Sequence, residues 1–150
     1  MSYIDALIKN CEAAKKAKPT KVIEVRKVSD LDGFQTAVYV IEESGGNPED
    51  TFSAFSRYKA KKERACAKLN APCQVMYVGS STTGVKKRIE QHLGRGNKGT
   101  YALHLEHWFQ GTHKIMVKQY DVPKEVLQII EDDLSFSLKP AFGKQGGNNK

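Results

Sequence analysis

The sequence predicts an α+β fold, because segments with helical periodicity alternate along it with runs of β-branched and aromatic residues. The strongest strand signal is 34–42, which is apolar on both faces from Ala37 to Ile41, as in a central strand. The strongest helical signal is 123–138, where apolar side chains occupy a broad arc. A chain of 150 residues suits one domain with a core of its own.

The N-terminal part begins with a predicted amphipathic helix over 3–17, which Pro19 ends. Its apolar side chains, spaced as on one face of a helix, are Ile4, Leu7, Ile8, Cys11 and Ala14. Residues 21–28 then predict an edge strand with charges on both faces. Residues 29–33 have the composition of a turn.

A basic segment, 44–73, follows the central strand. It starts as a loop, and Asp50 or Thr51 is the expected cap of a helix from Phe52 to about Leu69. The helix carries six cationic side chains, Arg57, Lys59, Lys61, Lys62, Arg64 and Lys68, against the single Glu63. Two interpretations remain open, a solvated helix face or a contact with a phosphate backbone.

The second half predicts two more strands and two more helices. Residues 75–79 form a short apolar run that ends in a Gly-Ser-Ser turn, and a basic helix over 85–93 follows. After the loop 94–99 and a short helix or turn within 101–109, 113–120 alternate as a strand does. Pro123 suits the first turn of the last helix, and 144–150 are expected to be a mobile tail.

Three polar side chains fall beside predicted core faces. On the helix 85–93, Arg88 and His92 lie one turn apart at the edge of the apolar stripe. They can line a cleft, or Arg88 can extend to solvent while His92 is a half-buried core residue. On the last helix, Glu131 lies just outside the apolar arc, where it can pair with a cation such as Arg88 or hold a metal ion.

The composition indicates a polyanionic partner. The net charge is +7 and the isoelectric point is near 9.3, which makes nucleic acid the commonest such partner. The N-terminus shows no signal peptide, and no window approaches the roughly 18 apolar residues of a membrane helix. We therefore expect a cytoplasmic protein.

The order of these features resembles the GIY-YIG nuclease family. Its two signature tripeptides correspond here to Ala37-Val-Tyr39 and Tyr77-Val-Gly79, in degenerate form. A helix with Arg88 and His92 follows, and then a helix that carries Glu131, with Pro140 nine residues later. The resemblance covers 34–42 and 75–143 and depends on the order of these motifs, since either tripeptide alone is weak evidence.

The resemblance implies a small three-stranded antiparallel sheet flanked by helices, to which 21–28 can add a fourth strand. It also implies phosphodiester hydrolysis with one divalent cation, Mg²⁺ or Mn²⁺, held by Glu131. Arg88 would hold a phosphoryl oxygen, Tyr39 would act as the general base, and Tyr77 would position the water or the phosphate. His92 would accept a proton from Tyr39 or contact the phosphate.

The chain departs from the family pattern in two places. Between the two signature tyrosines lie 37 residues, including the basic insertion 44–73, where the family usually has a short hairpin. Members that resemble restriction endonucleases carry such extensions. In addition, Gly143 stands where many members have an asparagine, for which Asn148 or Asn149 would have to substitute.

The leading hypothesis is therefore a metal-dependent DNA endonuclease of the restriction or defence type. The alternatives are a catalytically inactive nucleic-acid-binding domain on the same scaffold and a structure-selective repair nuclease. A homodimer or a partner subunit would help a domain of this size to cut both strands. The residues predicted to contact DNA are Arg57, Lys61, Lys62, Arg64, Lys86, Lys87, Arg95 and Lys98.

Overall fold

The computed structural model describes residues 2–144, and it confirms the α+β class. The helices are α1 (Tyr3–Lys16), α2 (Pro48–Ala60), α3 (Val85–Glu90) and α4 (Lys124–Leu138). The strands are β1 (Lys21–Glu24), β2 (Ala37–Gly45), β3 (Val75–Ser81) and β4 (Thr112–Gln119). Short 3₁₀ turns occupy Val28–Leu31 and Leu105–His107, and a π-helical turn, Gln91–Arg95, continues α3.

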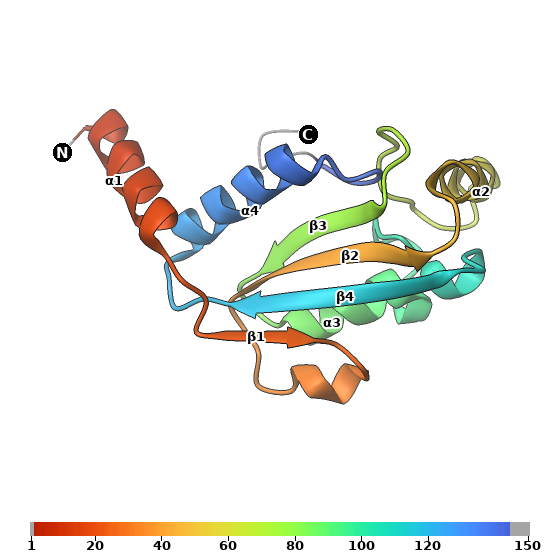
Figure 1. Cartoon of the computed structure of the whole chain (residues 1–150), viewed down its shortest axis with the longest axis horizontal. Helices are drawn as coiled ribbons and strands as arrows, with labels where there is room; N and C mark the ends of the chain where they lie inside the picture. Colours follow the sequence, from red (N-terminus) through yellow and green to blue (C-terminus); the bar gives the residue numbers. More distant parts are fainter. Residues whose placement is uncertain (1, 145–150) are drawn as a thin grey trace.

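The four strands form one antiparallel sheet in the order β1-β4-β2-β3 (Figure 1). The prediction that 34–42 contain a central strand is confirmed, because β2 pairs with both β3 and β4. The prediction of an edge strand within 21–28 is also confirmed, since β1 pairs with β4 alone. The sheet therefore has four strands, the larger of the two predicted numbers.

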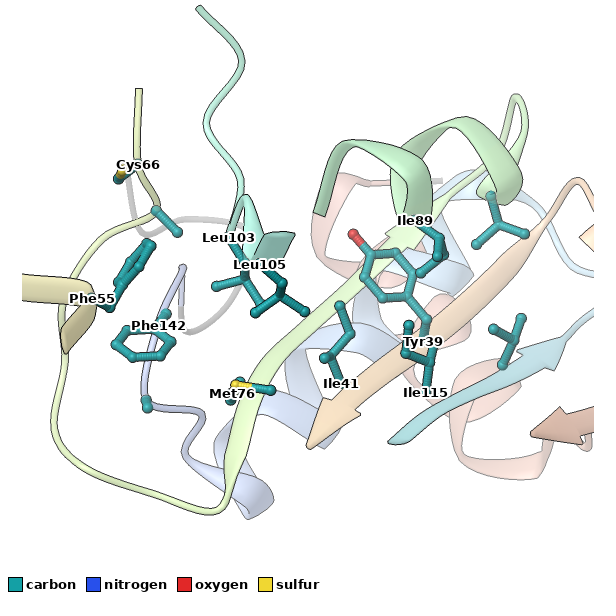
Figure 2. Close-up of a cluster of buried hydrophobic side chains, with 14 of the residues drawn as sticks. Tyr39, Ile41, Phe55, Cys66, Met76, Ile89, Leu103, Leu105, Ile115 and Phe142 are labelled. Atoms are coloured by element: carbon teal, nitrogen blue, oxygen red, sulfur yellow. The ribbon is translucent and has the colours of Figure 1, made fainter. Parts of the chain in front are cut away.

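Alternate residues of β2 enter two different cores. Tyr39 packs in the larger core with Val85 and Ile89 of α3, and Figure 2 shows its ring close to Ile89. Val38 instead packs with Leu127 of α4 in a smaller core. Helices α3 and α4 therefore cover opposite faces of the sheet, as the period of two along a strand requires.

Helix α1 forms where it was predicted, with Ser2 as its N-cap, but its apolar stripe does not face the sheet. The half-buried face of the helix, which packs on α4, contains Ala6, Asn10 and Ala14. Ile4 and Ile8 remain exposed on another side. Of the predicted stripe only Ala14 belongs to the half-buried face, so the contact with α4 uses mainly residues that hydrophobicity did not indicate.

The predicted helix Phe52 to Leu69 is wrong at both ends. Helix α2 begins at Pro48, and Asn47 is its cap, while Thr51 donates a hydrogen bond to the carboxylate of Glu43 instead. The helix ends at Ala60, and Lys62 follows in the left-handed region with φ 56°. The predicted helical continuation is an irregular segment.

Backbone pairing with a distant loop explains this early end. The N–H of Ala65 donates to the carbonyl of Lys98 at 2.7 Å, and the N–H of Ala67 donates to that of Ala102 at 3.1 Å. These bonds replace the helical ones and bury Cys66 and Ala67 in the core. Such long-range pairing leaves no local signal in the sequence.

No helix within residues 2–144 is long and apolar enough to cross a membrane. The predicted mobile tail lies outside the described residues, except for Lys144.

Candidate active site

A cavity of about 810 Å³ lies at the outer edge of β3 and is open to solvent. Four of the residues predicted to be catalytic line it, namely Tyr39, Tyr77, Arg88 and Glu131. They come from β2, β3, α3 and α4, so elements from both sides of the sheet contribute to one site.

The position of β3 at the sheet edge makes this convergence possible. In the pairing with β2, Gly79 lies opposite Tyr39, and Ser80 lies opposite Val38. Successive residues of β3 thus face α3 and α4 in turn. Among the described residues, the C-terminal segment bonds to β3 through the N–H groups of Ala141 and Phe142, which donate to the carbonyls of Val75 and Met76, and the cavity borders the strand beyond them.

The two signature tyrosines stack on the α3 side of the sheet. Their ring centroids are 6.1 Å apart, and the ring planes differ by 7°. Gly79 is required beside them, because a Cβ at this position would collide with the hydroxyl of Tyr39. The glycine of the second tripeptide therefore makes room for the phenol of the first.

His92 is fully buried and forms a hydrogen bond to the hydroxyl of Tyr39 at 3.0 Å. Its Nδ1 accepts the backbone N–H of Leu103 at 3.2 Å, so the neutral ring carries its proton on Nε2 and donates it to Tyr39. Burial, with the charge of Arg88, holds the pKa of His92 well below its usual range.

Both predicted roles of His92 need correction. His92 does not line the cavity, so it does not reach a phosphate there, and its Nε2 already holds a proton, so it is not placed to accept one from Tyr39. Instead it supplies a hydrogen bond to the oxygen of Tyr39. Burial, followed by the neighbouring Tyr77, raises the pKa of Tyr39 far above that of a free phenol, and Arg88 opposes this shift.

Arg88 is held at the cavity wall by three hydrogen bonds. Nη2 donates to the hydroxyl of Tyr77 at 3.1 Å and to the carbonyl of Tyr101 at 3.0 Å, while Nη1 donates to Gln91 at 2.9 Å. None of these acceptors carries a full negative charge, so the guanidinium keeps its positive charge available to an anion. Arg88 therefore lines a cleft, which was the first of its two predicted alternatives.

Glu131 reaches the same cavity from α4. Ser80 donates to its Oε1 at 2.7 Å, and Gln128 donates to its Oε2 at 3.2 Å. Burial raises the pKa of Glu131, although both hydrogen bonds oppose the rise. A carboxylate that has lost part of its hydration and faces an open cavity is a suitable ligand for a cation.

The donor set fits Mg²⁺ but not a cation that needs a complete protein cage. Residues 2–144 contain no cluster of three or more His, Cys, Asp and Glu side chains that would hold a metal. Mg²⁺, however, is commonly bound by one or two carboxylates together with water and substrate phosphates. Glu131 and a phosphate beside Arg88 would provide such a set.

The backbone and the Tyr77 ring favour a glycine at position 143. Gly143 has a φ of 92°, and a Cβ there would come within 2.5 Å of the Tyr77 ring. Lys144, the next residue, lines the cavity. The proposed substitutes, Asn148 and Asn149, lie outside the described residues.

The residues predicted to contact DNA separate into three groups. Lys62, Arg64 and Lys98 line a second opening beside the candidate catalytic cavity. Lys86 and Arg95 form salt bridges with Asp32 and Glu106, at 2.7 and 3.1 Å respectively. The third group consists of Arg57, Lys61 and Lys87, which are exposed to solvent and line none of the cavities formed by residues 2–144.

Several side chains at the site were not predicted to be functional. They are Ser80, Tyr101, Gln128 and Lys144, all of which line the candidate catalytic cavity, whereas Lys59 and Lys68, which also line it, were among the cations for which a phosphate contact was an open alternative. Of these four, only Gln128 could have been predicted from the sequence to lie near the site, since it lies one helical turn before Glu131.

Comparisons of the chain with protein-family models, with curated proteins and with solved structures give no match.

Proposed function

We propose that this protein is a metal-dependent endonuclease that hydrolyses phosphodiester bonds in DNA. The main support is the convergence of two phenols, one guanidinium and one half-buried carboxylate in a single open cavity. Each group suits one requirement of phosphodiester hydrolysis, and the order of the motifs resembles that of the GIY-YIG nucleases.

Arg88 would bind the scissile phosphate. Its planar guanidinium is already oriented by Tyr77, Tyr101 and Gln91, so little side-chain freedom is lost when an anion binds. The charge that builds up on the phosphoryl oxygens during attack would be stabilised by the same group.

As a phenolate, after its own hydroxyl proton has left to solvent, Tyr39 would take a proton from the attacking water. The N–H of His92 donates to its oxygen, so the hydroxyl proton of Tyr39 is directed away from His92. The same N–H and the charge of Arg88 stabilise the phenolate form, which burial otherwise disfavours. Tyr39 is therefore a competent base only once further positive charge enters the cavity.

Glu131 would hold that positive charge, with Ser80 and Gln128 fixing the orientation of its carboxylate. Bound Mg²⁺ or Mn²⁺ supplies Lewis-acid stabilisation of the phosphate and of the leaving oxygen. Gln128 also donates to Asp132 at 2.8 Å, which fixes the amide that in turn orients Glu131.

The test is cleavage of supercoiled plasmid by the purified protein in Mg²⁺ or Mn²⁺. We expect nicked or linear DNA with the wild-type protein and no product with EDTA or with Glu131→Ala, which should still bind DNA. Glu106→Ala, which removes an exposed carboxylate outside the cavity, is the matched control and should cleave normally.

If the wild-type protein binds DNA but cleaves no DNA substrate in either metal, the endonuclease proposal is wrong. The protein would then be better described as a nucleic-acid-binding domain on this scaffold. A parallel assay on RNA of the same sequence tests the preference for DNA.

A further inference from the structure

Tyr101 is a large aromatic side chain left in solvent at the rim of the catalytic cavity. It is 70% exposed, although the adjacent Ala102 and Leu103 are completely buried. Its side chain takes no part in the core or in the proposed chemistry, yet it borders two cavities, the catalytic one and the basic one beside it. A ring at the junction of two cavities that contain cationic side chains is suited to a ligand that combines a flat apolar face with negative charge.

The backbone beneath this ring is held firmly. The carbonyl of Tyr101 accepts a hydrogen bond from Arg88 at 3.0 Å, and the carbonyl of Thr100 accepts one from the buried His104 at 3.0 Å. The position of the ring is therefore tied to the guanidinium that would bind the scissile phosphate. A tyrosine on a fixed backbone has few torsions left to order when it binds a partner.

Cationic side chains surround the neighbouring cavity. They are Lys59, Lys62, Arg64 and Lys98, and Glu63 is the single acidic residue that lines it. The salt bridges formed within residues 2–144 include none of these four cations. This cavity is therefore suited to a second phosphate of the same strand.

Together, a phosphate site at Arg88, an exposed ring and a second basic site provide the kinds of contact by which proteins bind a single nucleic-acid strand. Aromatic side chains interleaved with cations are the usual means of binding unstacked bases. In a paired duplex both faces of each base are covered by its neighbours, so Tyr101 has a base face to bind only where a nucleotide is unpaired.

We propose that Tyr101 stacks on an unpaired base next to the scissile phosphate, so that DNA with an unpaired nucleotide at the cleavage position is the preferred substrate. This inference rests on the proposed function, because it places the scissile phosphate at Arg88. It gives Tyr101 a role in selecting the substrate and none in the chemical step.

The test measures binding without cleavage. Oligonucleotides that carry 2-aminopurine, as a paired duplex or as the same duplex with a single-nucleotide bulge, are titrated with protein in EDTA. We expect wild-type protein to quench the fluorescence of the bulged base, and Tyr101→Phe to do the same. Tyr101→Ala should abolish the quenching and weaken binding of the bulged DNA about tenfold, with less than twofold change for the paired duplex.

Tyr3→Ala is the matched control, because Tyr3 is also a largely exposed tyrosine but lies on α1, remote from the cavity lining. Equal losses on paired and bulged DNA, or quenching that persists in Tyr101→Ala, would overturn the inference. Cleavage in Mg²⁺ separates this failure from that of the proposed function. A protein that stacks but does not cut disproves the nuclease, whereas one that cuts regardless of Tyr101 disproves only the stacking.

Discussion

The candidate catalytic cavity and the cavity beside the start of β4 each contain an arginine and a glutamate, and they differ in how those charges are arranged. In the candidate catalytic cavity, Arg88 is bound by neutral acceptors, while Glu131 accepts bonds from neutral donors. In the other cavity, of about 480 Å³ between the segment after β1 and the start of β4, Arg95 and Glu106 bind each other at 3.1 Å.

The same two kinds of charged residue are therefore paired with each other in one cavity and held by neutral partners in the other. The Arg95–Glu106 pair is largely exposed and already neutralised, so it has little left to offer a ligand. Arg88 and Glu131 are oriented by separate neutral partners and keep opposite charges in one cavity. A phosphate and a cation can therefore bind side by side there.

Tyr39→Phe should lower the rate of plasmid cleavage by about 1000-fold, since it removes the proposed base and the acceptor of the His92 N–H. The second cavity of this comparison, which contains Arg95 and Glu106, is lined by no tyrosine and therefore has no equivalent general base. Tyr120→Phe, in the core on the α4 face, is the control and should retain cleavage. Circular dichroism must show both variants folded, and an active Tyr39→Phe would rule out this base.

Arg88→Lys should reduce kcat/KM for cleavage by about 100-fold, because an ammonium group cannot reproduce the planar contacts to a phosphate. The same change in the second cavity, Arg95→Lys, should leave cleavage within twofold of wild type. The measurement is steady-state cleavage of a fluorescent oligonucleotide. Equal losses in the two variants would mean that Arg88 has no special position.

The double variant Lys62→Ala/Lys98→Ala should weaken DNA binding about tenfold, and it should lower the slope of log K against log salt by about two. Lys86→Ala/Arg95→Ala removes the same net charge, but from residues that are already paired with Asp32 and Glu106. We expect its affinity to stay within about threefold of wild type. Fluorescence anisotropy at several salt concentrations distinguishes the two, and matching slopes would contradict the distinction.

Glu131→Gln should stabilise the metal-free protein by an amount on the order of 1 kcal/mol at neutral pH. Because burial raises the pKa of Glu131 in the folded state, its ionisation favours unfolding. The wild-type and variant stabilities should therefore agree below the ordinary pKa of a glutamate. They should diverge as the pH rises through the higher folded-state pKa.

Urea unfolding from pH 4 to pH 8 in EDTA measures this difference. Glu106→Gln serves as the control in the second cavity and should show no such stabilisation. Addition of Mg²⁺ should raise the stability of the wild type and have little effect on Glu131→Gln. If the wild type is more stable than Glu131→Gln in EDTA, burial of the ionised Glu131 carboxylate does not destabilise the fold.

Local patterns were enough to predict much of this protein. The β-branched and aromatic residues of 34–42 and the helical period in 85–93 and 123–138 located β2, α3 and α4, and with them Tyr39, Arg88 and Glu131. These features depend on the spacing of neighbouring residues, which can be read along the chain. The order of the strands in the sheet was not available from spacing.

Tertiary contacts decided the rest. Helix α2 ends at Ala60 because Ala65 and Ala67 pair with a loop more than thirty residues away, and no local pattern records that pairing. The proton position on His92 depends on one backbone N–H from Leu103. The site itself exists because β3 is an edge strand whose alternate residues meet α3 on one face and α4 on the other. Periodicity shows which face of a strand or helix a residue occupies, but only the folded sheet shows which residues from different elements come together at its edge.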